Sequence, residues 1–137
     1  MVFTVAASAF AGDKNIDEKI TKAFEKEFSA AQGATWSVKN DVYQVTFNYY
    51  DRTISAFYDK KGSLLGVTRY MLSTDLPYYL QKELKEYYTE YWVTDLFELS
   101  NENGTSYFVT LKNSAETVVL SSNTQNGWEL FNQYKNH

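Results

Sequence analysis

The sequence predicts an α+β fold built from tandem α-β-β-β-β repeats, with two helices packed on one face of an antiparallel sheet. Two observations lead to this prediction. Apolar residues recur every four positions in residues 16–28 and 76–88, which is the spacing of an amphipathic helix. After each of these segments, apolar and polar residues alternate through four shorter stretches, which is typical of strands with one buried face.

The first predicted helix follows Asn15. Its apolar stripe consists of residues four positions apart: Ile16, Ile20, Phe24 and Phe28. Asn15 and Glu18 have the spacing of a capping box, in which each side chain bonds the other residue's backbone amide. Gly33 is expected to end the helix, because glycine readily takes the left-handed conformation found there.

The second predicted helix spans residues 75–88. Its apolar stripe is again spaced by four: Leu76, Leu80, Leu84 and Tyr88. Asp75 is expected to cap the first free amides, and Pro77 suits a first turn, where its missing N–H has no partner to lose. We expect both stripes to be core.

Eight strands are predicted between and after the helices. They span residues 35–39, 42–49, 53–58, 64–72, 92–100, 105–111, 116–121 and 128–134. Asn40-Asp41 indicates a tight turn between the first two strands. Asn126-Gly127 indicates a two-residue hairpin turn before the last strand, because both positions tolerate positive φ.

The two halves match each other at fixed offsets. Trp36 and Trp92 lie 56 positions apart (92 − 36), and Tyr43 and Tyr107 lie 64 apart (107 − 43). The difference indicates a first hairpin about eight residues longer in the second half. We therefore expect residues 12–137 to form a single domain of two repeats, 15–72 and 75–135, whose free sheet edges join into one sheet.

Composition excludes several classes of function. The 137-residue chain has a net charge of −4, which disfavours a nucleic-acid surface, and no apolar run long enough to predict a transmembrane segment. It has no cysteine, and its one histidine is His137. We therefore expect no enzyme activity, no cofactor, no metal site and no catalytic residue. A hydrolase with an unrecognised site is the least favoured alternative.

The first residues predict where the protein is located. Residues 1–11 are small and apolar and end in Ala9-Phe10-Ala11, an A-x-A cleavage pattern, so we interpret them as a signal-peptide remnant. The mature protein would then begin at Gly12 and be periplasmic or secreted. The alternative is an ordinary apolar first strand.

These elements together resemble a known family. The motifs are Phe24-x-x-x-Phe28, a strand opened by Trp36, Tyr43-x-Val-x-Phe47, Tyr58-Asp-Lys-Lys-Gly62 and Leu76-Pro77. They are similar to the PepSY-like secreted proteins of the Bacteroidetes, also called β-lactamase-inhibitor-protein-like (BLIP-like). The resemblance covers residues 16–134. It implies a signal peptide, helices on an antiparallel sheet, no catalytic motif and, as the family name indicates, a role in inhibiting an enzyme.

The sheet face opposite the helices is the predicted binding surface, because it carries small polar residues and a few aromatics. Its candidate partner-binding residues are Gln44, Thr46, Asn48, Phe57, Phe108 and Thr110. The first hypothesis is a non-catalytic module that binds a protein or peptide of unknown identity, as a peptidase inhibitor would. The alternative is a carrier or sensor of a small amphipathic ligand, with its pocket between helices and sheet.

Overall fold

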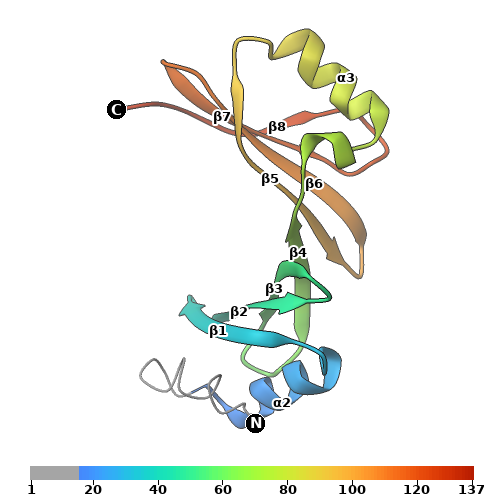
Figure 1. Ribbon diagram of the computed structural model, residues 1–137. Helices are drawn as coiled ribbons and strands as arrows, with labels where there is room; N and C mark the ends of the chain where they lie inside the picture. The colour runs from blue at the N-terminus through green and yellow to red at the C-terminus, as the bar shows by residue number, and fades with distance from the viewer. Residues whose placement is uncertain (1–15) are drawn as a thin grey trace. The chain divides into compact units, whose positions relative to one another are not determined.

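A computed structural model of the chain describes residues 16–137 (Figure 1). These residues contain an eight-stranded antiparallel sheet and two α-helices. They divide into two compact units with a boundary between Arg69 and Tyr70, and each unit has its own apolar core. The predicted signal segment 1–11, the predicted mature start at Gly12 and the predicted capping residue Asn15 lie outside the described residues.

Unit 1 consists of one helix followed by four strands. The elements are α2 (Glu18–Glu27), β1 (Gln32–Lys39), β2 (Val42–Tyr49), β3 (Arg52–Tyr58) and β4 (Leu64–Tyr70). Successive strands pair antiparallel. Asn40 and Asp41 have φ of 51° and 65°, which is the positive-φ pair of a two-residue hairpin turn, so the predicted turn is confirmed.

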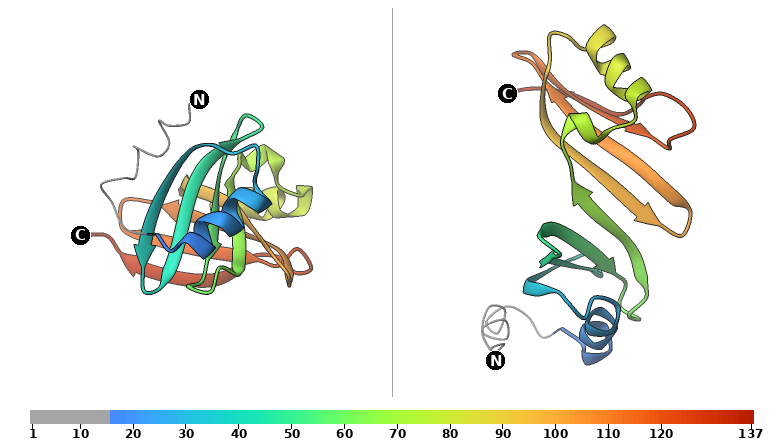
Figure 2. Two further views of the ribbon diagram at one scale, coloured as in Figure 1. Left: turned by 90° about the horizontal axis from the view of Figure 1, so that it is seen from below. Right: turned by 45° about the vertical axis from the view of Figure 1, so that its right-hand side comes forward.

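Helix α2 lies over one face of the unit 1 strands (Figure 2). Ile20 and Phe24 are buried against Val45 and Phe47 of β2, as the four-residue stripe predicts. The Phe24 ring lies 4.9 Å from the Phe47 ring and meets it edge to face. Burying a side chain of this size contributes roughly 1.5–3 kcal/mol.

Both predicted ends of the first helix are wrong. Asp17 is the N-cap, and its carboxylate accepts a hydrogen bond of 2.9 Å from the Lys19 N–H. The helix ends at Glu27, well before Gly33. Gly33 instead has φ of 67° within β1, where the pairing with β2 is irregular, and glycine suits such a bulge because it has no Cβ.

Unit 2 has the same order of elements after a short 3-10 turn. They are η1 (Ser73–Asp75), α3 (Tyr78–Tyr87), β5 (Trp92–Asn101), β6 (Gly104–Lys112), β7 (Glu116–Ser122) and β8 (Glu129–Lys135). Strands β5 to β8 pair antiparallel in chain order. Helix α3 covers one face of these strands (Figure 2). Across both units the strand ends differ from the predicted ones by at most three residues.

The predicted start of the second helix is also wrong. The Asp75 carboxylate accepts a hydrogen bond from the Leu72 N–H at 3.0 Å and closes η1 rather than capping α3. Leu76 has an extended ψ of 154°, because the ring of the following Pro77 disfavours helical backbone before it. Helix α3 therefore begins at Tyr78.

The loop between β7 and β8 differs from the predicted hairpin. No two-residue turn forms at Asn126-Gly127; the loop runs from residue 123 to 128, and Thr124 has the positive φ, 72°. The loop places Trp128 in the core of unit 2, where its indole N–H donates to the Leu80 carbonyl at 3.0 Å. Burying Trp128 against α3 thus outweighs the local preference for a tight turn.

Candidate binding surfaces

The helix-free face of unit 1 is a polar surface with its own hydrogen bonds. Gln44 and Thr46 alternate with core residues of β2 and so point away from α2. The Thr46 hydroxyl lies 2.8 Å from the Ser55 hydroxyl, and Gln44 Nε2 lies 3.4 Å from both. Asn48 Oδ1 accepts a hydrogen bond from Thr53 at 3.0 Å. Three predicted site residues thus form one polar patch.

Phe57 is the aromatic residue of this same face. It lies opposite Gln44 on β2 and Gly66 on β4, and it is half-buried. A glycine partner leaves room beside the ring, and cross-strand aromatics commonly fill such gaps. Phe57 therefore completes the unit 1 surface at one side of the polar patch.

The helix-free face of unit 2 carries a continuous row of aromatic rings, which we call the aromatic row. It consists of Tyr70, which ends β4 and is the first residue of unit 2, and of Phe97, Phe108 and Phe131. Phe97 and Phe108 are paired across β5 and β6 and stack with ring centroids 5.3 Å apart. Phe131 and Tyr70 are each 64% exposed, so the row reaches solvent at both ends.

Sequence reasoning found only one member of the aromatic row, Phe108. The predicted hairpin at residues 101–104 contained the missing signal. In a regular antiparallel hairpin the numbers of paired residues have a constant sum. Pairing Asn101 with Gly104 gives a sum of 205, and Phe97 and Phe108 have the same sum, so they lie opposite each other. Phe131 could not be found in this way, because the β7–β8 register contains an irregularity next to it.

Acidic and hydroxyl groups flank the aromatic row. Asp95 lies opposite the predicted site residue Thr110, two positions along β6 from Phe108. A hollow of about 120 Å³ opens beside the rings of Phe108 and Phe131, and Glu129 lines it together with serine hydroxyls. This surface therefore offers rings, hydroxyls and carboxylates to a partner.

A larger groove lies on the helix side of unit 2. It has a volume of about 490 Å³ and runs between η1, the second half of α3 and the ends of β5 and β6. Leu84 and Leu111 are among its apolar lining residues, with the rings of Tyr88 and Tyr91. Lys85 is the charged residue among those that line it. This is the position at which the sequence predicts a small-ligand pocket.

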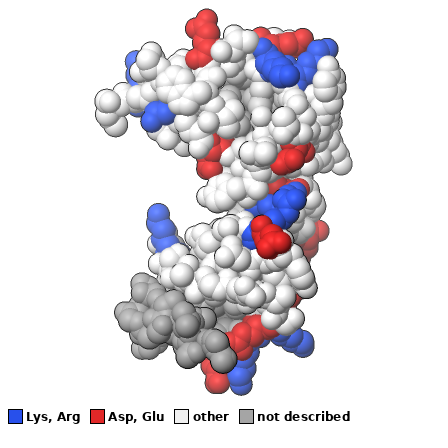
Figure 3. All heavy atoms as spheres, in the orientation of Figure 1, with Lys and Arg blue, Asp and Glu red and all other residues white. Residues whose placement is uncertain are grey.

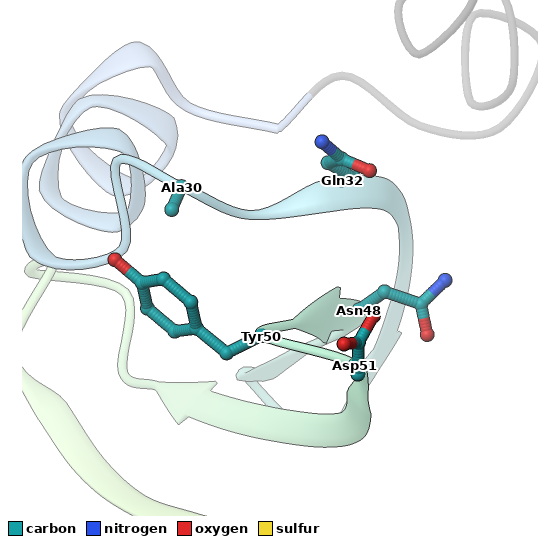
Figure 4. Close-up of a pocket in the computed structure, with 5 residues that line it drawn as sticks. All are labelled: Ala30, Gln32, Asn48, Tyr50 and Asp51. Carbon is teal, nitrogen blue, oxygen red and sulfur yellow. The ribbon is translucent and has the colours of Figure 1, made fainter.

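Unit 1 contains a pocket of about 580 Å³ at the turn between β2 and β3 (Figure 4). Tyr50 and Asp51 form the turn, with φ of 50° and 66°, and the Tyr50 ring extends from it toward Ala30. The predicted site residue Asn48 lines the pocket with Gln32. Its walls are mostly amide, phenol and carboxylate groups.

The displaced carboxyl pKa values do not indicate acid–base chemistry. Backbone hydrogen bonds, first from Ser63, lower the pKa of Asp59 in the β3–β4 turn. Side-chain hydrogen bonds from Tyr91 and Gln133 lower the pKa of Glu116. Both groups therefore stay ionised at neutral pH, whereas a general acid must hold its proton there.

The charged side chains are not gathered by sign on the face that Figure 3 presents. Figure 3 shows lysine and arginine interspersed with aspartate and glutamate on the face it presents, without a large basic patch. Within residues 16–137, no three histidine, cysteine or acidic side chains are close enough to hold a metal ion. None of the helices in this range has the length and hydropathy to cross a membrane.

No protein-family profile and no curated protein matches the chain. Solved structures do match it. A BLIP-like protein from Bacteroides fragilis is 20% identical, with a TM-score of 0.74 over 91% of this chain and 89% of that chain. A protein from Bacteroides eggerthii, provisionally assigned to the periplasm, is 9% identical, with a TM-score of 0.77 over 89% and 90%. A DUF2874 family protein from Bacteroides ovatus is 12% identical, with a TM-score of 0.77 over 89% of both chains.

These similarities concern the fold. The chain has the fold of BLIP-like and DUF2874 proteins of Bacteroides, which confirms the predicted BLIP-like resemblance at this level. Membership of the PepSY-like group stays a prediction.

Proposed function

We propose that the protein is a non-catalytic periplasmic or secreted module that binds another protein through the helix-free face of unit 2. The aromatic row is the observation that carries this proposal. Three consecutive ring contacts, with centroids 5.2–6.2 Å apart, place the four side chains of the row together on one face. Contiguous aromatic surface of this kind marks protein-binding sites, because rings bury much area at low entropic cost.

The flanking groups suggest the chemistry of the partner. Asp95 and Glu129 lie beside the row, and the whole chain has a net charge of −4. A partner segment with an apolar side chain between lysine or arginine residues would match both the rings and the carboxylates. The BLIP-like protein from Bacteroides fragilis, which shares the fold, adds support for a binding role. Inhibition of an enzyme is one form that such binding would take.

The test compares wild type with a Phe108→Ala/Phe131→Ala double variant as baits in periplasmic extract. We expect one protein to be retained by wild type and lost by the double variant. Phe57→Ala is the matched control, since it removes a half-buried ring from the unit 1 surface instead. Binding of the purified partner should then weaken about 30-fold or more in the double variant, as expected for a hot spot worth about 2 kcal/mol.

The proposal fails if the double variant, with unchanged far-UV circular dichroism, binds the partner as tightly as wild type. If Phe57→Ala is the variant that loses the partner, the surface lies instead on unit 1, with Gln44, Thr46 and Asn48. A partner lost by both variants would require both surfaces, as the sequence-based choice of Phe57 and Phe108 implies.

The groove on the helix side of unit 2 supports a second candidate function. Its volume of about 490 Å³ falls within the range of small-ligand sites, roughly 300–1,000 Å³. A carrier or sensor of a small amphipathic ligand would use it. Native mass spectrometry of freshly purified protein that finds no bound small molecule at any collision energy would count against this function.

We also infer how the chain is organised and exported. We infer that residues 12–137 are one domain of two duplicated α-β-β-β-β repeats, because both units show one helix followed by four antiparallel strands. We also infer that residues 1–11 direct export. Amino-terminal sequencing of protein secreted from a Bacteroides host should give a chain that begins at Gly12, and a chain that begins at Met1 would exclude cleavage there.

A further inference from the structure

We propose that the groove of unit 2 binds an amphipathic anion, with an aromatic or alkyl body and a carboxylate or sulfonate head. This inference rests on the second candidate function and adds the class of ligand. The groove combines an apolar floor with a hydrogen-bond donor and a cation. Helix α3 and its C-terminal end provide the donor and the cation, and β5 and β6 complete the floor.

The floor of the groove runs from the buried core of unit 2 to its partly exposed edge. Leu111 of β6 is only 2% exposed, whereas Val93 of β5 is 44% exposed at the edge of the groove. Leu84 and Tyr88 pack against the same core and are half-buried. A flat apolar body that entered here would cover surface which the fold itself leaves partly wet.

The tyrosines on this side of the groove differ in what their hydroxyls do. The Tyr91 hydroxyl donates to the Glu116 carboxylate. The Tyr88 hydroxyl has no hydrogen-bond partner among residues 16–137, and its ring meets the Tyr91 ring with centroids 5.6 Å apart. Burial and the nearby Glu83 carboxylate raise the pKa of Tyr88, so its hydroxyl keeps its proton and remains a donor.

The charge at the groove selects an anion. Lys85 lines the groove, and no ion pair involves it within the described part of the chain. None of the acidic side chains in residues 16–137 lines the groove. Glu83 accepts a hydrogen bond from the Trp128 N–H, and Glu116 is occupied by Tyr91 and Gln133. A cationic head would therefore meet Lys85, whereas a carboxylate or sulfonate can bond both Lys85 and the Tyr88 hydroxyl.

The experiment uses two fluorescent probes that share an aromatic body. One is 8-anilinonaphthalene-1-sulfonate, which carries an anionic head, and the other is N-phenyl-1-naphthylamine, which carries none. The test variant is Lys85→Gln. The matched control is Lys82→Gln, an exposed lysine of the same helix that does not line the groove. Val93→Trp fills the groove from an exposed strand position and reports whether the probe binds there.

We expect wild type to bind one sulfonate probe, Lys85→Gln to bind it about tenfold more weakly, and Lys82→Gln to bind it unchanged. The neutral probe should bind wild type and Lys85→Gln equally. Val93→Trp should lose both probes while keeping the far-UV spectrum of wild type. Phe108→Ala should bind both probes as wild type does, since the aromatic row is on the opposite face of unit 2.

Each alternative result would overturn a specific part of the proposal, either the anionic head or the groove itself. Equal loss of the sulfonate probe in both lysine variants would mean a nonspecific charge effect and would overturn the anion assignment. Binding of both probes that is insensitive to Lys85 but abolished by Val93→Trp would keep the groove as a ligand site and overturn the anion head. Binding that survives Val93→Trp, or no binding at all, would overturn the groove itself.

Discussion

Replacing Trp128 with phenylalanine should destabilise unit 2, because Trp128 ties the β7–β8 loop to α3. Its indole N–H donates to the Leu80 carbonyl at 3.0 Å. Its backbone N–H donates to the Glu83 carboxylate at 3.2 Å. The ring itself belongs to the apolar cluster around Leu80 and Leu111. No other side chain of the loop contributes to this cluster.

The expected cost has two parts. Loss of the indole hydrogen bond costs about 0.5–1.5 kcal/mol, and the smaller ring leaves a cavity that adds about 1 kcal/mol. We therefore expect Trp128→Phe to lower the free energy of unfolding by about 2 kcal/mol, since the two losses add at one site. The backbone bond to Glu83 should remain.

Urea unfolding followed by far-UV circular dichroism measures this difference without relying on tryptophan fluorescence. The matched control is Trp92→Phe, since Trp92 is 55% exposed and its indole has no hydrogen-bond partner among the described residues. Its free energy of unfolding should change by less than about 0.5 kcal/mol. Equal midpoints for the two variants would show that burial of Trp128 does not hold the loop against α3.

Two further predictions concern the β3–β4 turn and the hydrogen bond between Tyr91 and Glu116. Gly62→Ala should lower the free energy of unfolding in urea by about 2 kcal/mol or more, because Gly62 has φ of 88° and a Cβ there would lie 3.2 Å from the Lys19 carbonyl oxygen. Gly104→Ala, with φ of 117° and nothing within 4 Å, should cost less, and equal costs would exclude the Lys19 contact as the cause. Tyr91→Phe should raise the pKa of Glu116 toward 4.5, measured by carboxyl-carbon NMR. Because the pKa of Glu116 is lower in the folded than in the unfolded protein, its ionised carboxylate stabilises the fold above pH 4.5, and this contribution is lost as the pH falls. The difference in free energy of unfolding between wild type and Tyr91→Phe should therefore decrease below pH 4.5. A difference that stays constant with pH would contradict this assignment.

The repeating apolar positions were the part of the fold that the sequence could predict. Burial depends on side-chain spacing, and the stripes around Phe24 and Leu80 have the spacing of a helix, so both helices were found. The helix starts were missed for a local reason. Asp17 and Asn15 are both good caps, and the choice between them depends on where the chain leaves the core, which spacing alone does not contain.

The candidate surfaces were only partly predictable. Alternation places Gln44 and Thr46 on the helix-free face, and the structure agrees. The aromatic row depends on strand register, and register in turn depends on the irregularities between Val93 and Asp95 and next to Phe131. An inserted residue changes which side chains are neighbours, and no pattern in a single strand reveals it.

The two helix-free faces differ in how much binding energy they can supply to a partner. On unit 1, Thr46, Ser55 and Gln44 already bond one another, so a partner that displaced these bonds would gain little net energy. On unit 2, Phe108 and Phe131 are in contact with each other, but the exposed ring of Phe131 still has surface to bury. Binding energy should therefore come mainly from the aromatic row. The polar patch of unit 1 should add little to affinity, because its hydroxyls and the Gln44 amide already bond one another.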